Sequence, residues 1–156
     1  MKTIKIGMIG FGTIGVGVAK ILAENRNIIK KRLGAEGELV KIADLDIITD
    51  RGIALAEGVL TTSVDEVINH PDISVCIELI GGYEPARTFM LQAIAQGKHV
   101  VTANKALLAK HGDELFLAVA QKGLSIGFEA SIGGAIPIIR SMREAFVANQ
   151  IQSIEG

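Results

Sequence analysis

The sequence predicts an α/β fold with a doubly wound parallel sheet, and three observations support it. Short β-branched runs alternate along the chain with segments of helical period, as in sheets whose strands are joined by helical crossovers. A glycine-rich turn separates the first such run from the first helix. Hydrophobic residues make up 49% of the 156 residues and aromatic ones 4%, so the apolar content is mainly Ile, Leu, Val and Ala. A chain of this length and composition can bury a core as one domain.

The charge balance and the hydrophobic content each exclude one class of protein. The 16 Lys and Arg residues against 17 Asp and Glu give a formal net charge of −1. This balance lacks the basic excess of a nucleic-acid-binding domain, and the hydrophobic content is too high for a disordered chain. The 18 glycines, with three prolines and no low-complexity tract, indicate tight turns. We therefore expect a folded domain with no nucleic-acid partner.

The N-terminus resembles a secretion signal at first sight, because Lys2 and Lys5 precede the uncharged stretch 6–19. Five glycines in that stretch argue against the helix of a signal. The stretch is also shorter than the roughly 20 residues that span a bilayer. The single cysteine, Cys76, lies in an apolar run, which fits a buried, inert thiol in a reducing compartment. We expect a cytoplasmic protein with no membrane partner.

The elements of the N-terminal half follow from β-branched runs and helical spacing. A helix is predicted at Thr13–Glu24, and the polar, basic stretch 25–38 is expected to be an irregular excursion. Ser63 and Glu66 have the spacing of a capping box, in which each side chain bonds the other's main-chain N–H. Strands are predicted at Thr3–Ile9, 39–43 and 59–62.

The C-terminal half also alternates between strand-like and helix-like segments. Pro85 suits the first turn of a helix and Gly97 its C-terminal stop. Helices are predicted at 85–97, 105–123 and 137–148. The second of these is interrupted near Gly112, and 151–154 reads as a strand just beginning. Strands are predicted at 74–80, His99–Thr102 and 124–128.

Residues 10–15 match the G-x-G-x-x-G fingerprint of dinucleotide-binding turns. The match follows an apolar strand and opens a helix, which is the context that the motif requires. Gly10 makes the turn, Gly12 lets a pyrophosphate approach the main chain, and Gly15 lets helix and strand pack closely. The N–H groups and partial positive charge of the helix N-terminus would bind the phosphates. This context favours a Rossmann-type nucleotide site over a turn without a ligand.

Asp44 is the candidate ribose-binding residue, because it stands at the end of strand two. It follows Gly15 by 29 positions, compared with about 20 in the usual spacing, and the stretch 25–38 accounts for the excess. The alternative is a solvated carboxylate that begins a turn, since Asp46 and Asp50 lie nearby.

The same carboxylate indicates a preference for NAD over NADP. Asp44 would repel a 2′-phosphate, and the preceding position is Ala43, where phosphate-binding relatives often carry Arg. Lys41 and Arg51 act in the opposite direction, because they flank Asp44 and could attract a phosphate. We predict NAD or NADP as the cofactor, with NAD preferred.

Lys105 stands where a cation is unfavourable. Asn104 is a good N-cap, which puts Lys105 into the first helical turn. A cation there opposes the helix dipole by about 0.3–1 kcal/mol. The charge therefore indicates an anionic or carbonyl-bearing ligand opposite Lys105; the alternative is a solvated lysine on a helix that starts later.

Glu129 follows the sixth predicted strand, at the sheet edge where ligands bind in open α/β folds. The loop 129–137 is rich in small residues, so its main chain can approach a ligand or an ion closely. A tight strand-to-helix turn would have a similar composition.

Four segments, spread over the chain, together resemble the homoserine dehydrogenase family. They are Gly-Phe-Gly-Thr-Ile-Gly at 10–15, Glu-Leu-Ile-Gly-Gly at 78–82, Thr-Ala-Asn-Lys-Ala-Leu-Leu at 102–108 and Glu-Ala-Ser-Ile-Gly-Gly-Ala-Ile-Pro-Ile-Ile at 129–139. The resemblance implies reversible NAD(P)-dependent interconversion of L-homoserine and L-aspartate 4-semialdehyde. That reaction belongs to the biosynthesis of threonine, methionine and isoleucine.

The resemblance also implies roles for individual residues. Phe11, Thr13 and Ile14 would contact the cofactor, and Lys105 would reach its nicotinamide end or phosphate in a supporting catalytic role. The expected cofactor-binding residues are Gly10, Phe11, Gly12, Thr13, Ile14, Gly15, Asp44, Gly81 and Lys105. The family binds a monovalent cation, usually sodium, partly through main-chain carbonyls. These map onto Glu129, Ile132, Gly134 and Ile136.

The resemblance covers only the cofactor domain of a longer enzyme. Residues 1–150 are expected to form the dinucleotide-binding domain, and 151–156 to begin the link into a substrate and dimerisation domain. Family members continue into an Asn-Gly-Thr segment and a domain that bears a Lys general acid. We therefore expect a homo-oligomer that acts on a small molecule, and no catalysis by this chain alone.

Two other functions are compatible with a glycine fingerprint. One is a sugar or other amino-acid dehydrogenase, although such enzymes usually set the corresponding lysine in Glu-Lys-Pro rather than Asn-Lys-Ala. The other is a non-catalytic, nucleotide-sensing regulatory domain, which has no reason to keep Lys105 or the loop 129–137.

Overall fold

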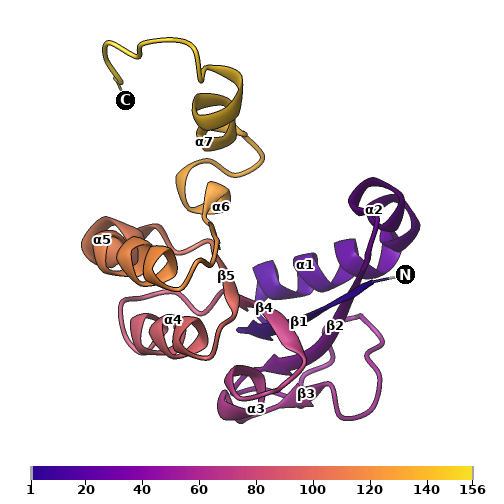
Figure 1. Cartoon of the computed structure of the whole chain (residues 1–156). Coiled ribbons are helices and arrows are strands. Elements are labelled where there is room, and N and C mark those ends of the chain that lie inside the picture. The colour runs from indigo at the N-terminus through magenta and orange to yellow at the C-terminus, as the bar shows by residue number, and fades with distance from the viewer. Residues whose placement is uncertain (1, 156) are drawn as a thin grey trace.

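The computed structural model describes residues 2–155, and in this part of the chain six parallel strands form one sheet in the order β3-β2-β1-β4-β5-β6 (Figure 1). β1 lies at the centre, paired with β2 on one side and β4 on the other. The strands are β1 (Thr3–Ile9), β2 (Glu36–Ala43), β3 (Leu60–Thr61), β4 (Ile73–Glu78), β5 (His99–Thr102) and β6 (Ile126–Gly127). Successive strands are added on one side of β1 as far as β3 and then on its other side from β4 onwards. This change of winding direction confirms the predicted Rossmann-type doubly wound fold.

Helices join the strands at every connection of the described chain except the loop between β2 and β3. The helices are α1 (Thr13–Glu24), α2 (Arg26–Leu33), α3 (Asp65–Ile68), α4 (Ala86–Ala95), α5 (Lys105–Gln121), α6 (Glu129–Ile132) and α7 (Ile138–Arg140), which continues into a π-helical turn, η1 (Ser141–Ala145). From α6 onwards the chain leaves the body of the domain and projects away from the sheet (Figure 1). In residues 2–155 no helix combines the length and apolarity needed to cross a bilayer.

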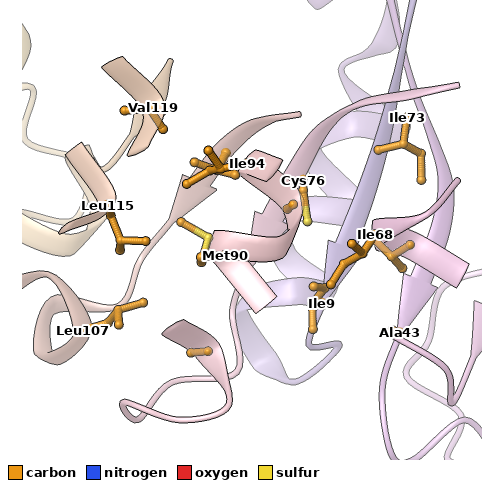
Figure 2. Packing of buried hydrophobic residues seen from close by; sticks show 14 residues of the cluster. Ile9, Ala43, Ile68, Ile73, Cys76, Met90, Ile94, Leu107, Leu115 and Val119 are labelled. Carbon is orange, nitrogen blue, oxygen red and sulfur yellow. The ribbon is translucent and has the colours of Figure 1, made fainter. Parts of the chain in front are cut away.

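The core lies on the two faces of the sheet. Successive strand residues alternate between faces, so Ile9 and Cys76 belong to one cluster while Met8 and Ile77 belong to the other. The first cluster packs under α3, α4 and α5 through side chains such as Met90, Ile94 and Leu115 (Figure 2). The second cluster packs under α1 through Ala19. The sheet is therefore covered on both sides.

Cys76 is buried, as predicted from its apolar surroundings. Burial raises the pKa of its thiol to about 12, because a thiolate would lose its hydration there. The thiol is therefore protonated and unreactive in the folded chain.

Three predictions for the N-terminal half need correction. The stretch 25–38 contains helix α2, which ends at Gly34, and β2 begins at Glu36 rather than at 39. None of the α2 side chains is buried, so the stretch lacks the apolar period by which a helix is recognised. The capping box is also wrong, because Glu66 Oε1 accepts the Thr61 hydroxyl at 2.7 Å while Val64 is the N-cap of α3.

Some predictions for the C-terminal half are confirmed and others need correction. β5 and the start of α5 are confirmed, and the predicted interruption of α5 is a kink at His111. The fourth strand spans Ile73–Glu78 rather than 74–80, and the sixth is shortened to Ile126–Gly127. The last helical segment ends at Ala145 rather than 148, and no strand is formed at 151–154 within the described residues. Gly156, the end of the predicted link, lies outside them.

Candidate dinucleotide-binding site

The glycine turn between β1 and α1 has the close contacts that its motif predicts. Gly10 has a φ of +101°, and a Cβ there would lie 2.8 Å from the main-chain carbon of Leu79. A Cβ on Gly15 would lie 2.4 Å from the carbonyl oxygen of Gly10, so only glycine lets α1 pack against the turn. At Gly12, by contrast, no heavy atom of the described residues other than Gly12 and its two chain neighbours lies within 4 Å of a Cβ position. Gly12 thus faces open space into which a phosphate fits.

The N-terminus of α1 opens onto the same space. Gly12 is the N-cap and accepts the N–H of Val16 at 2.9 Å, which is the first backward bond of the helix. The N–H groups of Thr13 and Ile14 precede that bond and are available to an anion. Both side chains are exposed, whereas the Phe11 side chain is turned into the core with 2% of its surface exposed. Phe11 can therefore meet a cofactor through its main chain only.

Asp44 follows β2 and binds the glycine turn directly. Its Oδ2 accepts the Phe11 N–H at 2.5 Å, and its Oδ1 accepts the Asp46 N–H at 2.9 Å. Arg51 lies 3.5 Å from the same Oδ1, with its guanidinium 5.5 Å from the centre of the Phe11 ring. The buried Nε of Arg51 has no hydrogen-bond partner among residues 2–155.

The other candidate phosphate ligand, Lys41, is occupied elsewhere. Its Nζ donates to the Gly58 carbonyl at 2.7 Å and to Glu66 at 2.9 Å. Of the two basic residues that flank Asp44 in the sequence, only Arg51 contacts it.

A pocket of about 580 Å³ brings several predicted site residues together. It lies at the carboxyl ends of β1, β2 and β4, where the chain reverses direction across the sheet and where open α/β folds bind ligands. Four predicted residues line it: Gly10, Gly12, Asp44 and Gly81. Leu45, Leu79, Ile80 and Pro85 form much of its apolar wall, and Glu84 adds a carboxylate.

Lys105 lies in the first turn of α5, as predicted. Asn104 is the N-cap, and its Oδ1 accepts the Leu107 N–H at 3.1 Å. The Asn104 Nδ2 donates to the Gly82 carbonyl at 2.7 Å, which holds the start of α5 beside the pocket loop. The Lys105 side chain is exposed and is not among the residues that line the pocket.

The loop after β6 forms a separate pocket of about 530 Å³ with β5 and α7. Glu129 lines it, and its carboxylate accepts the N–H groups of Ile139 at 2.8 Å and Arg140 at 3.2 Å. The carbonyl oxygens of Glu129 and Ile136 each accept one main-chain N–H. Ile132, Gly134 and Ile136 do not line this pocket. No group of three or more His, Cys, Asp or Glu side chains in the described chain could hold a metal.

Sequence reasoning missed Glu78 as a site residue. Glu78 is fully buried at the end of β4 and accepts the Thr102 hydroxyl at 2.6 Å. The signal was a carboxylate at the end of an otherwise apolar strand, where burial demands hydrogen-bond donors.

Comparison with known proteins gives one family. The model of the NAD binding domain of homoserine dehydrogenase matches residues 10–129. Homoserine dehydrogenase from Synechocystis sp. is 42% identical over 154 residues, which cover 99% of this chain and 35% of that protein. The Bacillus subtilis enzyme is 39% identical and is matched over 100% of this chain and 36% of its own length.

Solved structures agree. A homoserine dehydrogenase from Thiobacillus denitrificans superimposes with a TM-score of 0.89 at 47% identity, over 97% of this chain and 35% of that one. The chain spans about a third of the length of the curated relatives it matches. With the glycine turn, the order of the strands and the family match in agreement, the chain belongs to the NAD-binding domain family of homoserine dehydrogenase.

Proposed function

We propose that residues 1–150 are the dinucleotide-binding domain of a homoserine dehydrogenase, which interconverts L-homoserine and L-aspartate 4-semialdehyde with NAD or NADP. The observation that carries the proposal is the convergence of Gly10, Gly12, Asp44 and Gly81 on one pocket at the reversal point of the sheet. The family of the chain supports the same reaction.

The residues of the pocket fit a dinucleotide. The open position at Gly12 and the N–H groups at the start of α1 suit a pyrophosphate, and the Asp44 carboxylate suits ribose hydroxyls. The bound nicotinamide supplies the hydride chemistry. Lys105, beside loop residues 80–84, is proposed to bind the nicotinamide end or a phosphate and thereby to support catalysis.

Binding of NADH to the 156-residue chain, followed by calorimetry, tests the cofactor site. We expect saturable one-site binding without oxidation of homoserine, because the chain spans about a third of its relatives and catalysis also needs a positioned substrate and acid. The full-length protein should reduce NAD or NADP when homoserine is added. Turnover of a different alcohol but not of homoserine would favour another dehydrogenase, and nucleotide binding without any turnover would favour a regulatory domain.

NAD is proposed as the preferred cofactor. The Asp44 carboxylate repels a 2′-phosphate, and Lys41 is paired with Glu66 rather than turned to the pocket. Arg51 lowers this preference, since it lies 3.5 Å from Asp44. Separate dissociation constants for NADH and NADPH decide the matter, and tighter binding of NADPH would contradict the proposal.

A monovalent cation, sodium in the first instance, is proposed to bind main-chain carbonyls of Glu129, Ile132, Gly134 and Ile136. Hard cations prefer such oxygens, and a carbonyl that accepts one N–H retains a second lone pair. Titration of the full-length enzyme with sodium chloride against choline chloride tests this. Activity that depends on ionic strength alone, and not on sodium, would contradict it.

The whole enzyme is proposed to be a cytoplasmic homo-oligomer. The apolar side chains of Ile136, Val147 and Ile154 are exposed on the C-terminal segment, and the single cysteine is a buried thiol. Sedimentation of the full-length protein as a monomer at micromolar concentration would contradict the oligomer.

A further inference from the structure

Glu78 is a buried carboxylate that the proposed hydride chemistry does not use. Its exposed fraction is 0%, and it lies at the last position of β4. Oε1 accepts the N–H groups of Ile80 at 2.8 Å and Gly81 at 3.1 Å, and Oε2 accepts the Thr102 hydroxyl at 2.6 Å. A carboxylate is costly to bury unless it is hydrogen-bonded, so each of these bonds constrains the group that donates it.

The bonds continue from Thr102 into the start of α5. Thr102 is fully buried, and its Oγ1 accepts the Asn104 N–H at 3.0 Å. Asn104 in turn donates to the Gly82 carbonyl at 2.7 Å. The Thr102 carbonyl also accepts the Ser131 hydroxyl at 2.9 Å, which attaches α6 to the same network. Two separate ties therefore join the loop after β4 to the turn between β5 and α5.

That loop is a wall of the dinucleotide pocket and needs external support. Ile80 and Gly81 line the pocket together with Gly10 and Gly12. Gly81 and Gly82 have φ values of +75° and +71° and carry no side chains that could fix the loop. The hydrogen bonds from Ile80 and Gly81 to Glu78 set the direction of the main chain where the wall begins.

We propose that Glu78 is a positioning residue of the dinucleotide site, and this inference rests on the proposed function. The buried carboxylate holds residues 80–82 in the shape that forms the pocket wall. Through the Thr102 hydroxyl it fixes this wall relative to Asn104, and so relative to Lys105. Glu78 is not expected to contact the dinucleotide, so its effect on binding passes through the loop.

Two nearly isosteric substitutions test the hydrogen bond between Glu78 and Thr102. Glu78→Gln places an amide donor against the Thr102 hydroxyl, and Thr102→Val removes that hydroxyl. Each should weaken NADH binding about tenfold, as expected for one buried hydrogen bond. Both substitutions remove the bond between Glu78 and Thr102, and Thr102→Val also removes the acceptor of the Asn104 N–H. The loss of NADH affinity in the double variant should therefore be smaller than the sum of the two single losses. Thr102→Ser, which keeps the hydroxyl, should restore the affinity.

Val100→Ala is the matched control for stability. Val100 is buried in the same strand and on the same face as Thr102, and like Thr102 it does not line the pocket, but its side chain has no hydroxyl to bond Glu78. It should lower the melting temperature while leaving the NADH dissociation constant unchanged at a temperature where all variants are folded. Equal weakening in Val100→Ala would overturn the positioning role.

Amide hydrogen exchange separates this inference from the proposed function. Exchange at Ile80 and Gly81 should be at least several-fold faster in Glu78→Gln than in the unmodified chain, because the neutral amide oxygen accepts their N–H groups more weakly than the carboxylate does. Failure of the unmodified chain to bind NADH would overturn the proposed function. Unchanged affinity in both single variants, or weaker binding without faster exchange at Ile80 and Gly81, would overturn the role of Glu78 alone.

Discussion

The Phe11 N–H donates to Oδ2 of Asp44 over 2.5 Å, so the candidate ribose-binding carboxylate also fixes the glycine turn. Asp44→Ala should therefore weaken NADH binding by at least about tenfold and lower the free energy of unfolding by about 0.5–1.5 kcal/mol, the contribution of a typical hydrogen bond. Asp44→Asn keeps an acceptor but loses the charge, and should narrow the difference in affinity between NADH and NADPH. Calorimetric titration with both cofactors measures these effects. If Asp44→Asn had the same ratio of NADH to NADPH affinity as the unmodified chain, the charge of Asp44 would not determine the cofactor preference.

Gly12 and Gly15 separate ligand binding from folding. Gly15→Ala should cost about 1–3 kcal/mol of stability, because its Cβ would lie 2.4 Å from the Gly10 carbonyl oxygen. Gly12→Ala should change stability by less than about 0.5 kcal/mol, since its Cβ enters open space, yet should abolish most of the NADH affinity. Urea unfolding and NADH titration of both variants check this. Normal NADH binding by Gly12→Ala would mean that the phosphates lie elsewhere.

Lys105 is expected to act on the cofactor and not on the fold. Its side chain is exposed and stands in the first turn of α5, where a cation gains nothing from the helix dipole. Lys105→Ala should lower kcat/KM of the full-length enzyme by about tenfold or more, or about 1.4 kcal/mol of transition-state stabilisation, while leaving stability unchanged. Lys31→Ala on α2 removes an exposed lysine far along the chain and serves as the control. Equal steady-state constants for the two variants would exclude a role for Lys105.

The buried Cys76 thiol should make the free energy of unfolding decrease at alkaline pH. Burial raises the pKa of its thiol from 9.0 to about 12, so above pH 9 the unfolded chain releases the thiol proton while the folded chain keeps it. The stabilisation is complete below pH 9 and decreases by about 1.4 kcal/mol for each pH unit above it. Between pH 8 and pH 10 the unfolding free energy of the unmodified chain should therefore fall by about 1.4 kcal/mol relative to Cys76→Ala. Burial of Lys98 lowers the pKa of that amine in both proteins and acts in the opposite direction.

The parts of the fold that were predictable have a regular pattern of apolar or β-branched residues, or a glycine or capping residue with a specific conformational role. β1, α1, β5 and the start of α5 follow from β-branched runs, the glycine fingerprint and the Asn104 cap. Helix α2 was not predictable from its apolar period, because its positions pack no side chain into the core. The end of the last helix and the shortened β6 were misplaced because boundaries depend on tertiary contacts more than on local sequence.

The site was predictable where chemistry needs a particular residue type at a fixed place in the fold. Gly12 and Asp44 are of this kind, since strand, turn and helix determine where they stand. Glu78 and Thr102 are 24 positions apart, and only the pairing of β4 with β5 makes them partners. Likewise, the sequence did not reveal that Arg51 would lie over the Phe11 ring, because the loop that returns it has no regular period.

The central place of β1 makes the N-terminus indispensable to the architecture. β1 is hydrogen-bonded to both β2 and β4, so it joins a pair formed by β2 and β3 to a trio formed by β4, β5 and β6. Proteolytic removal of the first nine residues would leave these two groups without a shared strand, whereas trimming the projecting residues after 145 would leave the sheet whole. During synthesis, β1 is made before β4, so the edge of β1 that pairs with β4 stays open until residues 73–78 have followed.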